Sequence, residues 1–211
     1  MYNKPRALRD HPEKLAILEF PDLIGPTLVT RDAAHIRQFH EMHRDIILKP
    51  LDGMGGMGIF RVGPDGMNLG SIIETLNRGG AQSVMVQKFL PEIAEGDKRL
   101  LIIGGEPVPY CLARIPQGSE VRGNLAAGGK GVARPLSARD WEIGRALGPV
   151  LDARGLLLAG VDVIGDCVTE INVTSPTCFQ EIQQQTGCDV PGLFQDALER
   201  ALEQAGRNAP G

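Results

Sequence analysis

Two acidic side chains and an amide late in the chain form the strongest candidate for a chemical site. Glu170 and Asn172 stand two positions apart in an apolar run, so on a strand both would point to the same face. Asp162 stands within another apolar run, Val161–Ile164, where an unpaired carboxylate is costly to bury. Hard oxygen ligands on one sheet face suit Mg²⁺, which commonly takes one or two carboxylates together with phosphates. Ordinary ion pairs across a solvated sheet face are the alternative interpretation.

Glycine crowds into the segment Gly53–Gly58, which has the pattern G-x-G-x-x-G. A dinucleotide-binding loop of that pattern would open a helix, whereas residues 59–62 read as a strand, and no Lys-Ser or Lys-Thr pair follows to make a P-loop. The segment is therefore predicted to be the tip of a hairpin whose backbone N–H groups can bind phosphate oxygens. A flexible hairpin without a ligand is the alternative. Lys49, at the end of the preceding strand, would bring a cation to the same phosphates.

Arginines and histidines provide two further candidates. Arg114 and Arg122 flank or enter a second glycine-rich stretch, and arginine binds carboxylates and phosphoryl oxygens with paired hydrogen bonds. Both could therefore hold an acidic substrate, although an arginine in a polar loop is more often simply solvated. His35, His40 and His43 lie on one predicted helix, but no further ligand is placed near them, so no metal site is expected there.

The elements that would carry these residues alternate between short strands and helices. Helices are predicted from an Asp10-x-x-Glu13 capping box to before residue 21, from residue 30, over 69–77, from a cap at Ser137, and near 191–204. Strands are predicted over 27–29, 45–49, 59–62, 83–87, 99–103, 108–115, 156–164 and 168–173, several joined as hairpins. The stretch 116–135 has five glycines and no periodicity, which predicts a structureless loop acting as a lid. This order predicts an α+β fold with antiparallel sheets.

The last hairpin tests the metal site, because strand register decides which side chains share a face. A two-residue turn at Gly165-Asp166 would pair Asp162 with Thr169 and turn Glu170 to the opposite face. A three-residue loop, or an equivalent bulge, pairs Asp162 with Glu170 and keeps both on the face of Asn172. We predict the second arrangement.

Composition excludes several classes of protein. The chain has 22 Lys and Arg against 26 Asp and Glu, so it lacks the basic excess typical of generic nucleic-acid or anionic-membrane binding. No apolar run approaches the ~20 residues of a membrane helix. The start lacks the apolar core of a signal peptide, and the four cysteines show no CxxC pairing, which together predict a cytoplasmic protein with free thiols.

Several longer segments resemble the ATP-grasp superfamily and, within it, the bacterial glutathione synthetases. The matching residues fall in the stretches 3–15, 46–56, 96–99, 105–118, 122–129 and 169–177, spread over nearly the whole chain. The resemblance implies an ATP-grasp fold, with a smaller lobe at about 10–90 that carries the glycine hairpin. It also implies a larger lobe at about 91–211 with a lid loop at 116–131 and the metal site. The implied reaction is ATP-dependent ligation of γ-glutamylcysteine and glycine to glutathione through an acyl phosphate, in a family that suggests a homo-oligomer.

The resemblance further implies a role for each matching residue. The phosphate ligands would be Lys14, Lys49 and the backbone of Gly53, Met54, Gly55 and Gly56. Adenine would meet Gln87, Lys88, Phe89 and Leu90, with Asp97 near the ribose and Arg99 near the phosphates. Arg114 would hold the reacting carboxylate or acyl phosphate, Arg122 would cover the substrate from the lid, and Ser175 would contact the substrate. Asp162, Glu170 and Asn172 would hold Mg²⁺, with Mn²⁺ as an alternative, and Asn172 would also lie by the nucleotide.

The sequence departs from the family at two places. The family begins with an additional N-terminal domain that helps bind the peptide, and this sequence starts almost where the ATP-gripping lobes start. An incomplete peptide site is therefore expected, and the alternative function is an ATP-binding fragment without ligase activity of its own. Met57-Gly58, after the glycine pair, is expected to loosen the hairpin. A kinase-like phosphotransferase is disfavoured because the sequence has no H-R-D-x-x-x-x-N or D-F-G segment.

Overall fold

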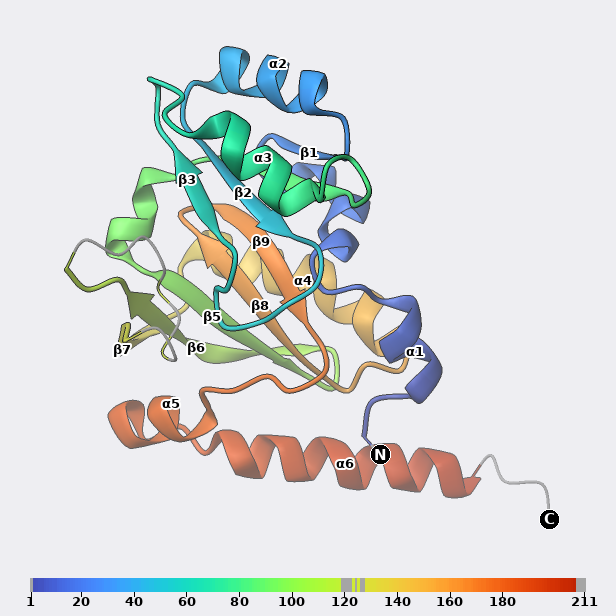
Figure 1. Cartoon of the computed structure of the whole chain (residues 1–211). Coiled ribbons are helices and arrows are strands. Elements are labelled where there is room, and N and C mark those ends of the chain that lie inside the picture. The colour runs from blue at the N-terminus through green and yellow to red at the C-terminus, as the bar shows by residue number, and fades with distance from the viewer. Residues whose placement is uncertain (1, 119–122, 124, 126–127, 208–211) are drawn as a thin grey trace.

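Two antiparallel sheets form the framework of the molecule, one above the other in Figure 1. The computed structural model describes residues 2–118, 123, 125 and 128–207. The upper sheet has four strands and the lower sheet five, and helices pack against both. The predicted α+β class with antiparallel sheets is confirmed.

The smaller sheet has the strand order β1-β4-β2-β3, with β1 at Thr27–Thr30, β4 at Val84–Lys88, β2 at Ile46–Pro50 and β3 at Phe60–Val62. Helices α2 (Ala33–His43) and α3 (Leu69–Asn77) cover its outer face (Figure 1). Ile46 and Leu48 are fully buried in the core beneath these helices, whereas Ile47 and Lys49 line the cavity beyond the opposite face. The two-residue alternation of β2 thus sends a cation toward the larger sheet.

The larger sheet has the order β7-β6-β5-β8-β9, formed by the strands β7 Lys130–Pro135, β6 Glu106–Ile115, β5 Asp97–Ile103, β8 Leu158–Ile164 and β9 Cys167–Asn172. Helix α4 (Ala138–Ala153) packs on one face and begins with the predicted capping box of Ser137 and Asp140. Helices α5 (Phe179–Thr186) and α6 (Val190–Arg207) pack on the apolar part of the other face, and α6 runs along the bottom of Figure 1. The rest of that face is polar and turns toward the smaller sheet.

The hairpin of β8 and β9 has the predicted bulge. A two-residue turn pairs Ile164 with Cys167, but the register shifts between Asp162 and Val163, so that Asp162 lies opposite Glu170. The extra residue on β9 restores the face that a two-residue turn alone would have reversed. The predicted register is confirmed, with the bulge rather than a three-residue loop.

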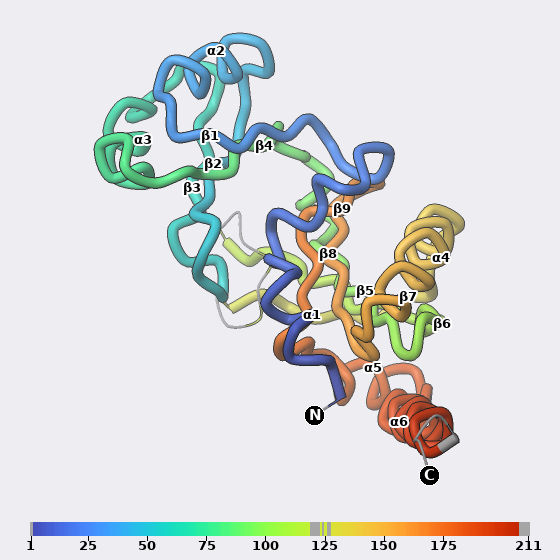
Figure 2. The backbone as a smooth tube through the Cα atoms, turned by 90° about the vertical axis from the view of Figure 1, so that its right-hand side faces the viewer, coloured from blue at the N-terminus to red at the C-terminus, as the bar shows by residue number. Residues whose placement is uncertain are grey.

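The N-terminal segment differs from its prediction. Helix α1 (Pro5–Asp10) ends where a helix was expected to begin, and only a 3₁₀ helix, η1 (Leu15–Glu19), followed by η2 (Pro21–Leu23), comes after it. The expected capping box is absent because the Glu13 carboxylate instead accepts hydrogen bonds from Val173 and Thr174. The segment runs along the larger sheet (Figure 2), and Ala16, Ile17 and Leu23 are buried in that sheet's core. The stretch from Glu13 to Ile24 therefore packs with the larger sheet.

Two further expectations about the C-terminal half were incomplete. Residues 130–135 of the expected loop form the edge strand β7, which pairs with β6. This strand was not predicted because it has a single partner strand and follows two glycines, residues 128 and 129. The expected lid loop at 116–131 lies partly outside the described residues. Helix α5 was not predicted, because Cys178 at its N-cap makes no side-chain capping bond. Of the helices described, none has the length and apolar character that a membrane crossing requires.

Candidate functional site

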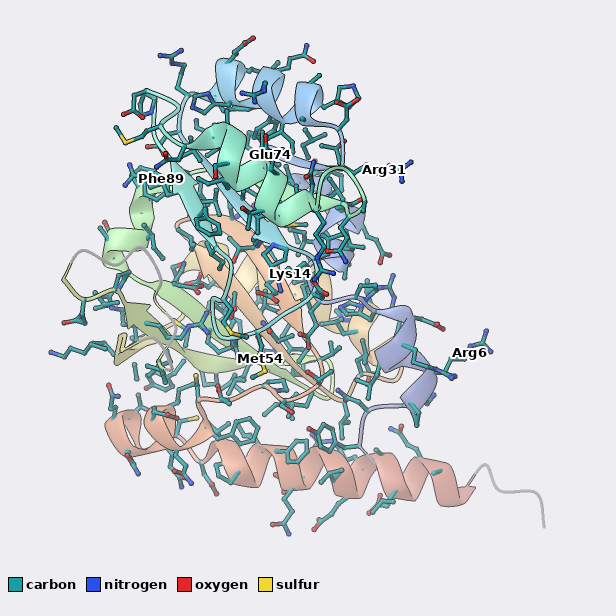
Figure 3. The ribbon with its side chains drawn as sticks, viewed as in Figure 1. Arg6, Lys14, Arg31, Met54, Glu74 and Phe89 are labelled. Carbon is teal, nitrogen blue, oxygen red and sulfur yellow. The ribbon has the colours of Figure 1, made fainter. Side chains whose placement is uncertain are left out.

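A cavity of about 540 Å³ lies between the two sheets. It is lined from above by the inner face of β2 and the loop from β2 to β3, and from below by the polar part of the larger sheet. Figure 3 shows Lys14 between the two lobes and Met54 on the loop that covers the opening. The short segment from Gln87 to Leu90, which leads from β4 toward η3 (Pro91–Glu95), closes one side.

Four charged residues on the floor of this cavity are cross-strand neighbours. Strand register places Arg114 opposite Asp97, and Arg99 opposite Asp162. The Arg99 guanidinium group donates from Nε and Nη2 to the two oxygens of Asp162, over 2.5 Å and 3.1 Å. Arg114 donates from Nη2 to Asp97 over 2.5 Å and lies 3.0 Å from Asp162 Oδ1. The two arginines and Asp162 are each less than a tenth exposed, so this cluster is held away from bulk water.

The two carboxyl groups of the cluster differ in their ionisation. Burial opposes the charge of Asp162, but the guanidinium groups of Arg114 and Arg99 outweigh it and lower its pKa to about 2. Burial raises the pKa of Asp97 to about 7, with Arg114 opposing and the negative charge of Asp162 adding to the shift. Asp97 Oδ1 is buried and has no hydrogen-bond partner among the described residues. One acid is therefore firmly ionised, and its neighbour has an oxygen free for a bound hydroxyl group.

The two lysines approach the cavity from opposite sides. Lys49 Nζ donates to the backbone carbonyl of Thr169 over 3.0 Å, which links β2 to β9 across the gap between the sheets. Burial, and then the positive charge of Lys14, lower the pKa of Lys49, while Glu170 opposes the shift. Lys14 Nζ donates to the Gly53 carbonyl over 3.0 Å and to Glu170 Oε1 over 3.2 Å. Two buried ammonium groups with donors to spare form a site prepared for an anion.

The glycine hairpin over the cavity has the backbone that its sequence requires. Gly53, Gly55, Gly56 and Gly58 all have positive φ angles, between 65° and 98°, which other residues rarely adopt. The side chains of Met54 and Met57 between them are largely exposed. The predicted hairpin is confirmed by the pairing of β2 with β3, and its tip borders the cavity as the sequence suggested.

The side of the cavity near Gln87–Leu90 is apolar. Its walls include Ile47, Ile93, Ile164 and Val168, none of which the sequence analysis had singled out. The backbone N–H groups of Lys88 and Phe89 donate to the carbonyls of Pro26 and Asp45, so these two amides are already used within the protein. An apolar wall beside polar groups suits a heteroaromatic ring.

The oxygen-bearing residues proposed for a metal lie close together on the β8–β9 hairpin. Asn172 Nδ2 donates to Asp162 Oδ2 over 3.3 Å, and Glu170 lies opposite Asp162 in the hairpin. The described residues contain no group of three His, Cys, Asp or Glu side chains placed to hold a metal by themselves. Two carboxylates and one amide nevertheless fit Mg²⁺, which usually completes its shell with water and phosphate oxygens. Asp162, Glu170 and Asn172 are therefore a suitable set only when a phosphate-bearing ligand is present.

The predicted site residues converge on this one cavity. It is lined by Lys14, Lys49, Gly53, Met54, Gly55, Gly56, Gln87, Lys88, Phe89, Leu90, Asp97, Arg99, Arg114, Asp162, Glu170, Asn172 and Ser175. Arg122 lies outside the described residues. The sequence analysis missed Glu13, which also lines the cavity, because its spacing from Asp10 matched a helix cap. It also missed the Thr169 carbonyl, for which a sequence carries no signal.

Two antiparallel sheets that enclose a cavity beneath a glycine-rich hairpin are the architecture of an ATP-grasp protein. Solved structures agree with this class. The structure superposes on an ATP-grasp ligase from Chryseobacterium gregarium that is associated with a ribosomally made peptide (TM-score 0.71, 19% identity, 95% of this chain and 63% of that one). It superposes similarly on the D-cycloserine synthetase DcsG (TM-score 0.69, 18% identity, 93% and 71% covered). At such low identity these similarities establish the fold alone.

Sequence comparison defines the family more narrowly. Residues 13–187 match the family described as the prokaryotic glutathione synthetase ATP-grasp domain, and the chain belongs to that family. It is 64% identical to a glutathione synthetase of Ralstonia nicotianae over 205 residues, and 56% identical to one of Escherichia coli O157:H7 over 202 residues. These alignments cover 97% and 96% of this chain but only 63% and 64% of the relatives. The chain thus spans a little under two thirds of the length of the curated relatives it matches.

Proposed function

We propose that this chain supplies the nucleotide site and the reaction centre of a glutathione synthetase. The reaction would join γ-glutamylcysteine and glycine to form glutathione, with ATP converted to ADP and phosphate. The observation that carries the proposal is the convergence of Lys14, Lys49, Arg99 and Arg114 on one cavity that also holds the Asp162–Glu170 pair. Four cations facing two carboxylates suit a ligand that is itself anionic and bound together with a metal ion.

ATP would lie with its purine ring against the apolar wall near Gln87–Leu90 and its phosphates beneath the glycine hairpin. The buried ammonium groups of Lys14 and Lys49 and the hairpin backbone would bind the phosphate oxygens. Asp97, which has one oxygen without a partner among the described residues, is suited to accept a hydrogen bond from a ribose hydroxyl. Arg99 would lie near the phosphates.

Asp162, Glu170 and Asn172 would hold Mg²⁺, or Mn²⁺ in its place, through their oxygen atoms. When bound, such an ion would draw charge from the phosphates and orient them for transfer. The protein's own contribution there is to keep Asp162 ionised, which the two flanking arginines ensure.

The proposed chemistry needs a carboxylate held close to the terminal phosphate. The cysteinyl carboxylate would attack that phosphate, release ADP and form an acyl phosphate; the amine of glycine would then displace phosphate and form the peptide bond. Arg114 would bind the carboxylate and then the acyl phosphate, where its charge stabilises the negative charge that develops during transfer. Ser175 would contact the substrate, and Arg122 would cover it from the lid. We further propose that residues 116–131, up to the start of β7, form this lid, and that the lobes lie at about 10–90 and 91–211, with the η1 segment packed against the larger of them. We also propose that the protein assembles from identical subunits.

A second candidate function is nucleotide binding without ligation by this chain alone. It is favoured by the share of the relatives' length that the chain spans, since part of the peptide site could come from the remainder. The two candidates are separated by incubating the chain with Mg-ATP, γ-glutamylcysteine and glycine, and measuring glutathione by mass spectrometry and ADP by chromatography. Glutathione with equal ADP supports the first; binding of Mg-ATP by calorimetry without glutathione supports the second; the absence of any nucleotide binding refutes both.

A further inference from the structure

Glu13 makes an unusual set of contacts at the edge of the cavity. Its Oε1 atom accepts three hydrogen bonds: from the backbone N–H groups of Val173 and Thr174, over 2.8 Å and 3.0 Å, and from the Thr174 hydroxyl, over 2.9 Å. Its backbone carbonyl accepts a fourth from the N–H of Ile171, over 3.0 Å. A short irregular segment near the N-terminus is thus bound to the end of β9 through both the main chain and the side chain of one residue.

The residues on either side of these contacts belong to the proposed site. Asn172 lies between the bonded residues Ile171 and Val173, and Ser175 follows directly after Thr174. Lys14 follows Glu13 in the chain and contacts both Glu170 of β9 and the Gly53 carbonyl of the hairpin. Glu13 is therefore hydrogen-bonded to the backbone of residues 171–174 and, as the preceding residue, covalently joined to Lys14.

We infer that Glu13 is a positioning residue, which fixes the Lys14 ammonium group relative to the Glu170–Asn172 end of β9. Phosphate and metal ligands must be held within a fraction of an ångström for both to bind the same nucleotide. A carboxylate that accepts three donors with one oxygen is a strong fixed point, since hydrogen bonds to a charged acceptor exceed neutral ones in strength. The inference rests on the proposed function for what is positioned, but the contacts of Glu13 are independent of it.

The same segment offers a matched control. Glu19, at the end of η1, also has a carboxylate that binds a partner from another element, here Arg154 of the larger lobe, over 2.5 Å and 3.1 Å. This pair is partly exposed and does not line the cavity. Glu19→Ala therefore removes a tertiary ion pair from the same segment without changing a residue that lines the cavity.

Glu13→Ala, Glu13→Gln, Thr174→Ala and Glu19→Ala would be compared in the full chain by two measurements. Hydrogen exchange of the ligand-free protein would report the protection of the amides at 173 and 174. Calorimetric titration with ADP, with and without MgCl₂, would report how far Mg²⁺ increases the affinity. Glu13→Ala should accelerate exchange at 173 and 174 by about tenfold or more and remove most of the Mg²⁺ enhancement. Glu13→Gln, which keeps an acceptor oxygen, should retain most of both, and Glu19→Ala should retain all.

Thr174→Ala removes one of the three donors and leaves both backbone amides, so it tests the inference should Glu13→Ala not fold; an intermediate loss of the Mg²⁺ enhancement is expected. Unchanged exchange at 173 and 174 in Glu13→Ala would overturn the inference, as would a Mg²⁺ enhancement equal to that of the wild type. An equal loss in Glu19→Ala would also overturn it, since the effect would then be general loosening. A wild-type chain without affinity for ADP refutes the proposed function, and with it the assignment of what Glu13 positions.

Discussion

Replacing Lys49 by methionine should have opposite effects on stability and on nucleotide binding. Lys49 is 5% exposed, and the described part of the chain offers its ammonium group one hydrogen-bond acceptor, the Thr169 carbonyl. Loss of that bond would cost about 1 kcal/mol, while removal of a buried charge with a lowered pKa gains at least as much. The free energy of unfolding should therefore stay within about 1 kcal/mol of the wild type or rise.

Binding should respond in the other direction. A phosphate oxygen would accept hydrogen bonds from the Lys49 donors that no described residue uses, and a charge-assisted hydrogen bond contributes about 1–3 kcal/mol. Lys49→Met should therefore weaken Mg-ATP binding by about 5- to 150-fold in calorimetry, at constant salt. Lys4→Met, which removes an exposed lysine outside the cavity, is the matched control and should bind as the wild type does.

The pH dependence gives an independent check on the same residue. A lysine whose pKa is lowered by folding binds its proton less tightly in the folded state, so its cost to stability is present at neutral pH. That cost disappears as the pH rises toward the ordinary value of 10.5. Any stability advantage of Lys49→Met in urea unfolding should therefore shrink between pH 8 and pH 10.5, to the extent that the fold persists. Wild-type affinity for Mg-ATP in the variant would refute the phosphate role, and an advantage that grows with pH would refute the burial argument.

Three further predictions follow from single contacts. Asn3 makes three buried hydrogen bonds, two with the backbone of Leu158 and one with the Val173 carbonyl. Asn3→Ala should therefore lower the free energy of unfolding by about 2–4 kcal/mol in urea titration, and a loss below about 0.5 kcal/mol would contradict this. Asp162, whose pKa is lowered to about 2, stabilises the fold above pH 4 and loses this effect as the pH falls. The free energy of unfolding of Asp162→Asn should therefore be about 2 kcal/mol below that of the wild type at pH 7, and this difference should shrink from pH 4 toward pH 2. A Cβ at Gly160 would lie 2.8 Å from Arg99 Cδ, so Gly160→Ala should weaken Mg-ADP binding in calorimetry, but not when Arg99 is already alanine.

The site could be predicted in outline because its residues interrupt regular patterns. It is costly to bury an acid among apolar residues, such as Asp162, or a cation on a buried strand, such as Lys49, unless another group pairs with it. The bulge at Asp162 also followed from a physical constraint, since a regular register would have separated Asp162 from Glu170. The pairing of strands that lie far apart in the chain could not be predicted from the sequence. The contact between Arg99 and Asp162 joins strands 63 residues apart, and no local pattern specifies that β5 pairs with β8.

Local rules failed where a tertiary contact competed with them. Asp10 and Glu13 have the spacing of a capping box, which predicts a helix, but the Glu13 carboxylate binds the backbone after β9 instead. Three donors offered by a preformed strand end exceed the single N–H that a capping box provides. The capping-box spacing is present in the sequence, but Glu13 binds the larger sheet instead of capping a helix.

The charges on the cavity floor indicate how stability and function are divided in this fold. Burying Arg99, Arg114 and Asp162 costs desolvation, and apolar residues of similar volume would serve stability equally well or better. Both arginines are nevertheless paired with Asp162, so each of these three charges has an opposite charge beside it. A ligand that brings phosphate and a cation can exchange partners with this cluster, taking up the arginines and freeing the carboxylate. The cluster therefore holds its binding groups in place through their mutual ion pairs before the ligand arrives, at a cost in stability.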